Sequence, residues 1–220
     1  LTGNMAGGWW VAMNTLFSLG VLALFENFIT EDKDNTADEN DWFPDGLLGI
    51  HVVSQFVCLS SMIWSVHHYH YNFLQLVLLS LSTGINSGGA AIVIAHELVH
   101  RKNAYMRFAG QLLLFSTGNI YFYIDHLKVH HKWVGTERDP ATARYGENVY
   151  LFFIRSTIQQ IKSSYRVEAT RLKAERKPTW WISNYVIASF VLQMLVWMLL
   201  VVLFGPWVLL AYLLQCFFAN

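Results

Sequence analysis

Long apolar segments dominate the pattern of hydrophobic and polar positions, and they predict membrane-spanning helices. Five segments are apolar enough to be considered as spans, although the last is short, and they cover roughly residues 9–29, 47–66, 73–95, 180–203 and 206–219. A sixth apolar segment covers roughly residues 106–124. We therefore expect an all-α integral membrane protein, a bundle of about five to six transmembrane or re-entrant helices.

Residues 148–176 show a different pattern, which is typical of a basic amphipathic helix. Apolar and basic positions recur at helical spacing, the apolar set being Leu151, Ile154, Ile158, Ile161 and Tyr165 and the basic set Arg155, Lys162, Arg166 and Arg171. Such a helix suits the surface of a membrane. Packing of the helix on the rest of the protein explains the pattern equally well, and the two interpretations are compatible.

Composition supports the membrane assignment. Hydrophobic residues make up 54% of the 220 residues and charged residues only 14%, against about 25% charged residues in a soluble domain. The two cysteines, Cys58 and Cys216, lie inside apolar segments and suggest neither a disulfide nor a set of metal ligands. We expect the lipid bilayer as a partner and no nucleic acid.

Five histidines form two compact boxes, and each box follows an apolar segment. The first box contains His96 and His100, and the second contains His126, His130 and His131. Residues four apart lie on one face of a helix, so each box can present two imidazoles in one direction. Five imidazoles exceed the four ligands of a zinc site, and imidazole also suits iron. The boxes therefore predict a polynuclear iron site at the edge of the membrane.

Three carboxylates near the boxes are candidates for supporting the metal ligands. A metal-bound histidine usually donates its other N–H to a carboxylate or carbonyl group, and the candidates are Glu97, Asp125 and Asp139. Each is explained equally well as a solvated charge or a helix cap. The first box also fits the zinc-protease pattern HExxH, with Glu97 as the base, but three further histidines in a second box argue against a protease.

A metal site shared by both boxes constrains the topology. Residues 106–124 then cannot cross the membrane once, and must lie in the interface or return to the same side. This topology puts all fifteen Lys and Arg residues on the side of the boxes, which the positive-inside rule makes the cytoplasmic-type face. It puts His67, His68 and His70 on the other side as interfacial residues, and we expect His51 to be buried and hydrogen-bonded.

Small residues occupy the middle of the third apolar segment, at Gly84, Gly88 and Gly89. We favour close helix packing of the GxxxG kind as their role. The alternative is that they leave space for an apolar substrate tunnel that leads to His96.

The two boxes, Tyr123-Ile124-Asp125-His126 and the stretch from Thr136 to Arg144 resemble the membrane alkane 1-monooxygenase (omega-hydroxylase) family, within the fatty-acid desaturase and hydroxylase superfamily. The resemblance implies two non-haem iron ions, activation of O₂, and hydroxylation of the terminal carbon of an aliphatic hydrocarbon. It implies electrons from a rubredoxin or ferredoxin-type donor with its reductase. It also implies that the metal ligands are His96, His100, His126, His130 and His131.

The sequence departs from the family pattern in three places. Val99 and Val129 stand where the family's boxes have Gly, and Leu127 stands where the second box has Asn. The family's third histidine box is absent from residues 1–220. We therefore expect residues 1–220 to form a single membrane domain and to be a fragment that lacks the start and the C-terminal histidine boxes.

The expected function is that of an O₂-dependent monooxygenase that hydroxylates the terminal carbon of alkanes or related aliphatic chains. A fatty-acyl desaturase or hydroxylase is the enzymatic alternative, and a diverged non-catalytic subunit of a membrane complex is the non-enzymatic one. The expected location is the bacterial inner membrane, or the endoplasmic reticulum or mitochondrial membrane in a eukaryote.

Overall fold

The computed structural model describes residues 1–29 and 42–220, and all its regular elements in these ranges are helical. Lys33, which enters the topology argument, lies outside the described residues. The chain divides into two compact units, residues 1–117 with 197–220, and residues 118–196. The expected all-α architecture is confirmed, and the single membrane domain stays a prediction.

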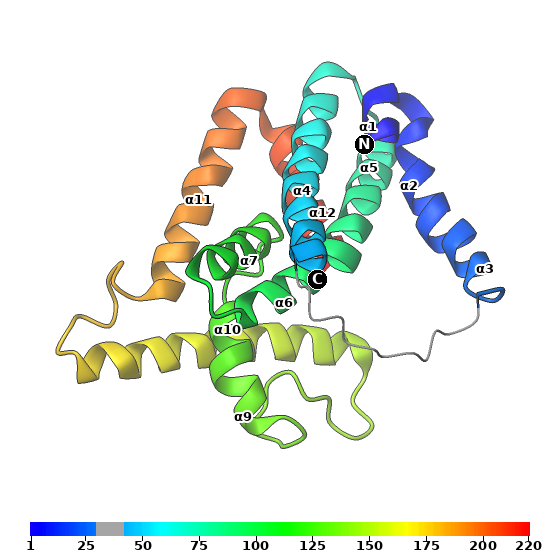
Figure 1. Cartoon of the computed structure of the whole chain (residues 1–220). Helices are drawn as coiled ribbons and strands as arrows, with labels where there is room; N and C mark the ends of the chain where they lie inside the picture. The colour runs from blue at the N-terminus through cyan, green and yellow to red at the C-terminus, as the bar shows by residue number, and fades with distance from the viewer. Residues whose placement is uncertain (30–41) are drawn as a thin grey trace. The chain divides into compact units, whose positions relative to one another are not determined.

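The first unit consists of the apolar helices and their short connections. Two of its helical stretches, Gly8–Phe25 and Phe73–His100, are continuous although their hydrogen-bond pattern changes along the way (Figure 1). Its elements are α1 (Thr2–Ala6), η1 (Gly8–Ala12), α2 (Met13–Leu16), η2 (Phe17–Leu22), α3 (Ala23–Phe25), α4 (Trp42–His68), α5 (Phe73–Asn86), η3 (Ser87–Ile92), α6 (Val93–His100), α7 (Ala104–Ser116) and α12 (Pro206–Ala219).

Within residues 1–29 and 42–220, four helical stretches are long and apolar enough to cross a membrane, and they cover Gly8–Phe25, Pro44–His68, Phe73–His100 and Tyr185–Phe204. They coincide with four of the five predicted spans, and the fifth is the shorter apolar helix α12. Helix α7, of 13 residues, is about 20 Å long at 1.5 Å per residue. It is too short for a hydrocarbon layer of about 30 Å, which supports the prediction that residues 106–124 do not cross.

Glycines let α12 approach the α5–η3 stretch closely. A Cβ on Gly84 would lie 2.5 Å from Cβ of Phe218, and a Cβ on Gly88 would lie 2.7 Å from the carbonyl oxygen of Ala219. A Cβ on Gly89 would meet no atom within 4 Å. Gly84 and Gly88 therefore serve close helix packing of the small-xxx-small kind, as the favoured interpretation predicted.

The second unit contains α8 (Phe122–Asp125), η4 (His126–His130), α9 (His131–Trp133), α10 (Val149–Ala174) and the first part of α11 (Tyr185–Phe204). Helix α10 begins where predicted, because the Asn148 side chain accepts a hydrogen bond from the backbone N–H of Tyr150 and caps its N-terminus. Its buried positions include Ser156 and Ser164, and Ser164 Oγ donates a hydrogen bond of 3.0 Å to the carbonyl of Tyr121. The other two buried positions of α10 are Glu168 and Leu172, so the helix packs on its unit through polar groups and one leucine.

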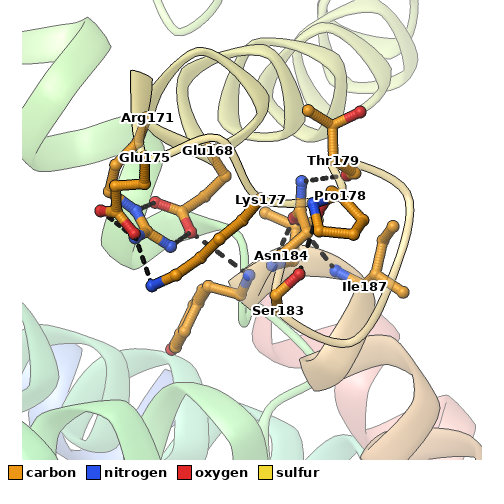
Figure 2. Close-up of polar contacts among 11 residues, drawn as sticks. Glu168, Arg171, Glu175, Lys177, Pro178, Thr179, Ser183, Asn184 and Ile187 are labelled. Atoms are coloured by element: carbon orange, nitrogen blue, oxygen red, sulfur yellow. Dashed lines mark hydrogen bonds and ion pairs between the residues drawn. The ribbon is translucent and has the colours of Figure 1, made fainter. Parts of the chain in front are cut away.

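A polar network holds the corner between α10 and α11 (Figure 2). Arg171 bridges the carboxylates of Glu168 and Glu175, with distances of 2.8 Å to each. Glu168 also accepts a hydrogen bond of 3.3 Å from the backbone N–H of Tyr185, the first residue of α11. The Asn184 side chain accepts from the next backbone N–H groups of α11 and caps that helix. The corner is therefore an ordered connection, with polar groups paired at the end of a membrane span.

Candidate metal centre

The first histidine box ends a long helical stretch. His96 and His100 lie one turn apart on α6, their ring centroids are 5.1 Å apart, and both side chains are exposed. The helix ends at His100, because Arg101 takes an extended conformation. Arg101 pairs with Glu97 at 3.0 Å and with Asp45 at 3.2 Å. The carboxylate of Glu97 thus engages an arginine, and its predicted role beside a metal ligand stays a prediction.

The second box lies on a π-helical turn, η4, which the sequence did not reveal. A π-helix has hydrogen bonds from residue i to i+5, so it places residues five apart on one face. His126 and His131 accordingly lie with ring centroids 4.3 Å apart, against 5.5 Å for His126 and His130. The pairing of residues four apart, expected from an α-helix, is therefore replaced by a closer pairing of residues five apart. Such π-turns occur frequently at functional sites.

Asp139 orients His130. Its Oδ2 lies 2.9 Å from Nδ1 of His130, and its side chain is completely buried. The hydroxyl of Thr142 donates to Oδ2 at 2.5 Å, and the backbone N–H of Ala141 donates to Oδ1 at 3.0 Å. A carboxylate held in this way fixes the ring of His130 and favours the tautomer with its proton on Nδ1.

Asp125, the neighbour of His126, is buried against α10. Its carboxylate accepts a hydrogen bond from the hydroxyl of Ser163. Burial raises the pKa of Asp125 to about 6. The hydrogen bond from Ser163 and the nearby His130 lower this pKa, and the charge of Asp139 raises it further. Its predicted role beside a metal ligand stays a prediction.

Four of the five predicted histidines form a cluster that could hold a metal ion: His96, His100, His126 and His131. His130 is outside this group and makes the contact with Asp139 described above. Imidazole nitrogens suit iron, and they also suit zinc, copper and nickel. The chemistry of the donors therefore fits a bound transition metal, and their type alone does not select which one.

Three of the other histidines make local contacts. His68 stacks on Trp64 with ring centroids 4.7 Å apart, and His67 packs edge-on against Phe204. His51 bonds through Nδ1 to the carbonyl of Leu47 at 2.9 Å, as expected of a hydrogen-bonded histidine. Its expected burial is wrong, because it lies on an exposed face of α4.

Helix packing accommodates Val99, which stands where the family's first box has Gly. Val99 is buried, and a Cβ on Gly110 of α7 would lie 3.0 Å from its Cγ1. The glycine on α7 thus makes room for the valine on α6. Val129 is buried as well. The added bulk of these two valines is therefore placed in the packed interior of the units, whereas Leu127 is partly exposed.

Comparisons with known proteins agree with this chemistry. The profile of the family described as fatty acid desaturase matches residues 71–220. The alkane 1-monooxygenase of Pseudomonas putida is 30% identical over 207 residues, which cover 90% of this chain and 51% of that protein. Alkane 1-monooxygenase 1 of Alcanivorax borkumensis shows the same identity and coverage.

A third relative widens the range of named substrates. The hydroxylase component of the xylene/toluene monooxygenase of Pseudomonas putida is 32% identical over 111 residues, which cover 50% of this chain and 30% of that protein. The chain spans about half the length of the alkane monooxygenases that it matches.

Proposed function

Because this chain belongs to the fatty acid desaturase family, we propose that it is the metal-binding part of an O₂-dependent monooxygenase that hydroxylates the terminal carbon of alkanes or related aliphatic chains. The observation that carries the proposal is the cluster of His96, His100, His126 and His131, together with four potential membrane spans in the described part of the chain. The names of its relatives support a hydrocarbon substrate.

We propose two non-haem iron ions held by His96, His100, His126, His130 and His131. Iron supplies the activation of O₂. The residues of this chain hold and orient the ligands: Asp139 accepts a hydrogen bond from Nδ1–H of His130, which leaves Nε2 as the ligand atom. The π-turn sets the rings of His126 and His131 close together. Electrons come from a rubredoxin or ferredoxin-type donor.

The chain is an integral membrane protein, and its apolar helices provide the surroundings that a hydrocarbon substrate requires. We propose the bacterial inner membrane as its location, or the endoplasmic reticulum or mitochondrial membrane in a eukaryote. A fatty-acyl desaturase or hydroxylase is the second candidate function, and the description of the matching family favours it.

The test uses the natural protein that carries this sequence, in membranes with a rubredoxin-type donor and its reductase. Alkanes and fatty-acyl substrates are supplied separately, and products are identified by mass spectrometry. We expect 1-alkanols from alkanes. Products from acyl substrates alone would favour the second candidate, and absence of oxygenated or desaturated products from both would contradict the proposal.

Variants then test the ligands. His131→Asn is expected to lose bound iron and turnover together, whereas the matched control His68→Asn, whose ring stacks on Trp64, is expected to keep both. Asp139→Asn is expected to weaken iron binding by about 10- to 100-fold, as losses of such supporting carboxylates do, measured by iron titration rather than by activity. Full iron content in His131→Asn would overturn the ligand assignment.

A further inference from the structure

The apolar face of α10 is exposed, which reverses the usual arrangement of an amphipathic helix. Leu151, Ile154, Ile158 and Tyr165, here called the α10 stripe, are between 36% and 64% exposed. The buried positions of the same helix are Ser156, Ser164, Glu168 and Leu172. An amphipathic helix normally turns its apolar side to the core. Across residues 1–29 and 42–220, protein atoms therefore leave the α10 stripe largely uncovered, and a different apolar medium must cover it.

A cationic hollow lies beside the stripe. At 100° per residue, Lys162 and Arg166 follow the edge of the stripe around the helix. With Arg138 and Arg144 of the preceding loop they line a hollow of about 380 Å³, together with a single carboxylate, Glu137. The guanidinium of Arg138 lies 4.7 Å from the centroid of the Trp133 ring, which orients it. Four cations around one hollow repel each other, and a bound phosphate group relieves that repulsion through charge-assisted hydrogen bonds.

The corner after α10 carries residues typical of a membrane interface. Trp180 and Trp181 are 68% and 54% exposed, directly before the span that begins at Tyr185. Tryptophan is enriched where a bilayer meets water. The Glu168 bond to Tyr185 ties α10 to the start of α11 (Figure 2), and α10 runs across the direction of that helix (Figure 1). This geometry puts α10 at the level of the lipid headgroups.

We propose that α10 lies in the plane of the membrane surface, with the α10 stripe in the acyl boundary and the cationic hollow holding the phosphate of an anionic phospholipid. Phospholipids present an apolar layer directly beside a layer of phosphate, which is the order of the stripe and the hollow on the helix. Residues 149–177 add seven basic residues against two acidic ones, which favours an anionic leaflet. The proposal does not depend on the metal centre.

The first experiment measures the depth of the stripe in the reconstituted protein. A bimane label is placed by Ile158→Cys on the stripe and by Thr170→Cys at an exposed position about 120° around α10 from Ile158, with Cys58 and Cys216 replaced by Ser. Nitroxide lipids labelled near the headgroup are expected to quench the label at 158 strongly and the label at 170 weakly. Equal quenching of both labels by aqueous iodide would overturn the proposal. A label at 158 shielded from both lipid and iodide would indicate a protein partner instead, which also overturns it.

The second experiment tests the hollow. The ratio of quenching at 158 by nitroxide phosphatidylglycerol to quenching by nitroxide phosphatidylcholine reports local enrichment of anionic lipid. We expect the double variant Lys162→Gln/Arg166→Gln to lower this ratio by about fivefold or more, because one cation near an anionic surface contributes a factor of about five. The control Lys173→Gln/Arg176→Gln removes the same charge from the C-terminal end of α10 and the turn that follows it, outside the hollow, and is expected to lower the ratio much less.

Two outcomes would overturn the lipid site. An equal effect of both double variants would mean that general electrostatic attraction, and no defined site, selects the lipid. Loss of the phosphatidylglycerol preference on adding inorganic phosphate, compared with chloride at equal ionic strength, would identify a soluble anion as the ligand. The expected result is that inorganic phosphate leaves the preference unchanged.

Discussion

At the scale of residues, Arg155 of α10 clamps the loop that carries Asp139. Its guanidinium donates to both carboxylate oxygens of Glu147, at 2.5 and 2.7 Å, and to the carbonyls of Pro140 and Thr142 at 3.3 and 3.1 Å. Asp139 lies in the same loop and orients His130. One charged side chain on α10 thus supports the position of a predicted metal ligand through the loop between them.

The pH dependence of stability tests this clamp. Hydrogen bonds from Arg155 and from the Arg144 backbone lower the pKa of Glu147 from 4.5 to about 2. A carboxyl group whose pKa is depressed in the folded state stabilises the fold above its unfolded pKa, and this contribution is lost as the pH falls through the folded pKa. We therefore expect the wild type to unfold at a higher temperature than Glu147→Gln at about pH 6. The difference should shrink between about pH 4.5 and about pH 2.

Thermal unfolding followed by tryptophan fluorescence measures this difference across the pH range. Glu137→Gln, which removes another carboxylate from the same loop, is the control and should change the unfolding temperature little. A wild-type advantage that stays constant down to about pH 2 would show that Glu147 acts by packing rather than by charge.

At the scale of elements, close helix approach depends on which side of the helix a glycine faces. Gly88 and Gly89 are neighbours in η3, yet only Gly88 faces α12. Substituting each of these two glycines therefore distinguishes the effect of helix packing from the effect of intrinsic helix preference.

Gly88→Ala is expected to destabilise the first unit by about 1–3 kcal/mol, because overpacked helix contacts cost this much. The new methyl group would lie 2.7 Å from the Ala219 carbonyl oxygen, so α12 must shift. Gly89→Ala meets open space and should be neutral or stabilise by up to about 1 kcal/mol, because alanine loses less backbone freedom. Unfolding midpoints in one detergent measure both, and equal midpoints would contradict the packing role of Gly88.

At the scale of the whole molecule, the number of donors limits the metal centre. Residues 1–220 provide four histidines in the cluster and a fifth in His130. The alkane monooxygenases that match the chain are about twice as long as the matched part. The two-iron site proposed above therefore needs more donors than these five histidines.

A protein consisting of residues 1–220 alone is expected to hold fewer than two tightly bound iron ions per chain. Two ions with at least four ligands each need about eight donor positions, less those filled by water or bridging groups. Elemental analysis after gel filtration with a weak chelator measures the ratio of iron to protein. Two retained irons per chain, together with oxygenase turnover, would show that the five histidines suffice.

The sequence by itself determined the class of the protein, four of its spans, the existence of α10, and the histidines of the cluster. These features are periodic or local: a span requires a long apolar run, an amphipathic helix repeats every 3.6 residues, and the boxes are short motifs. The small-residue packing of Gly84 and Gly88 was also predictable as a type of contact, although the sequence did not identify α12 as the partner.

Only the tertiary structure decided which groups meet across long stretches of chain. It replaced the expected pairing of His126 and His130 by the closer His126–His131 pair, because a π-turn changes which residues share a face. It left much of the apolar side of α10 exposed and buried Ser156 and Ser164, and Ser164 Oγ donates to the carbonyl of Tyr121. It placed Asp139 in hydrogen-bonding contact with His130, and Glu97 in an ion pair with Arg101. Sequence spacing could not separate these outcomes, because a carboxylate binds the cation or imidazole that folding brings within reach.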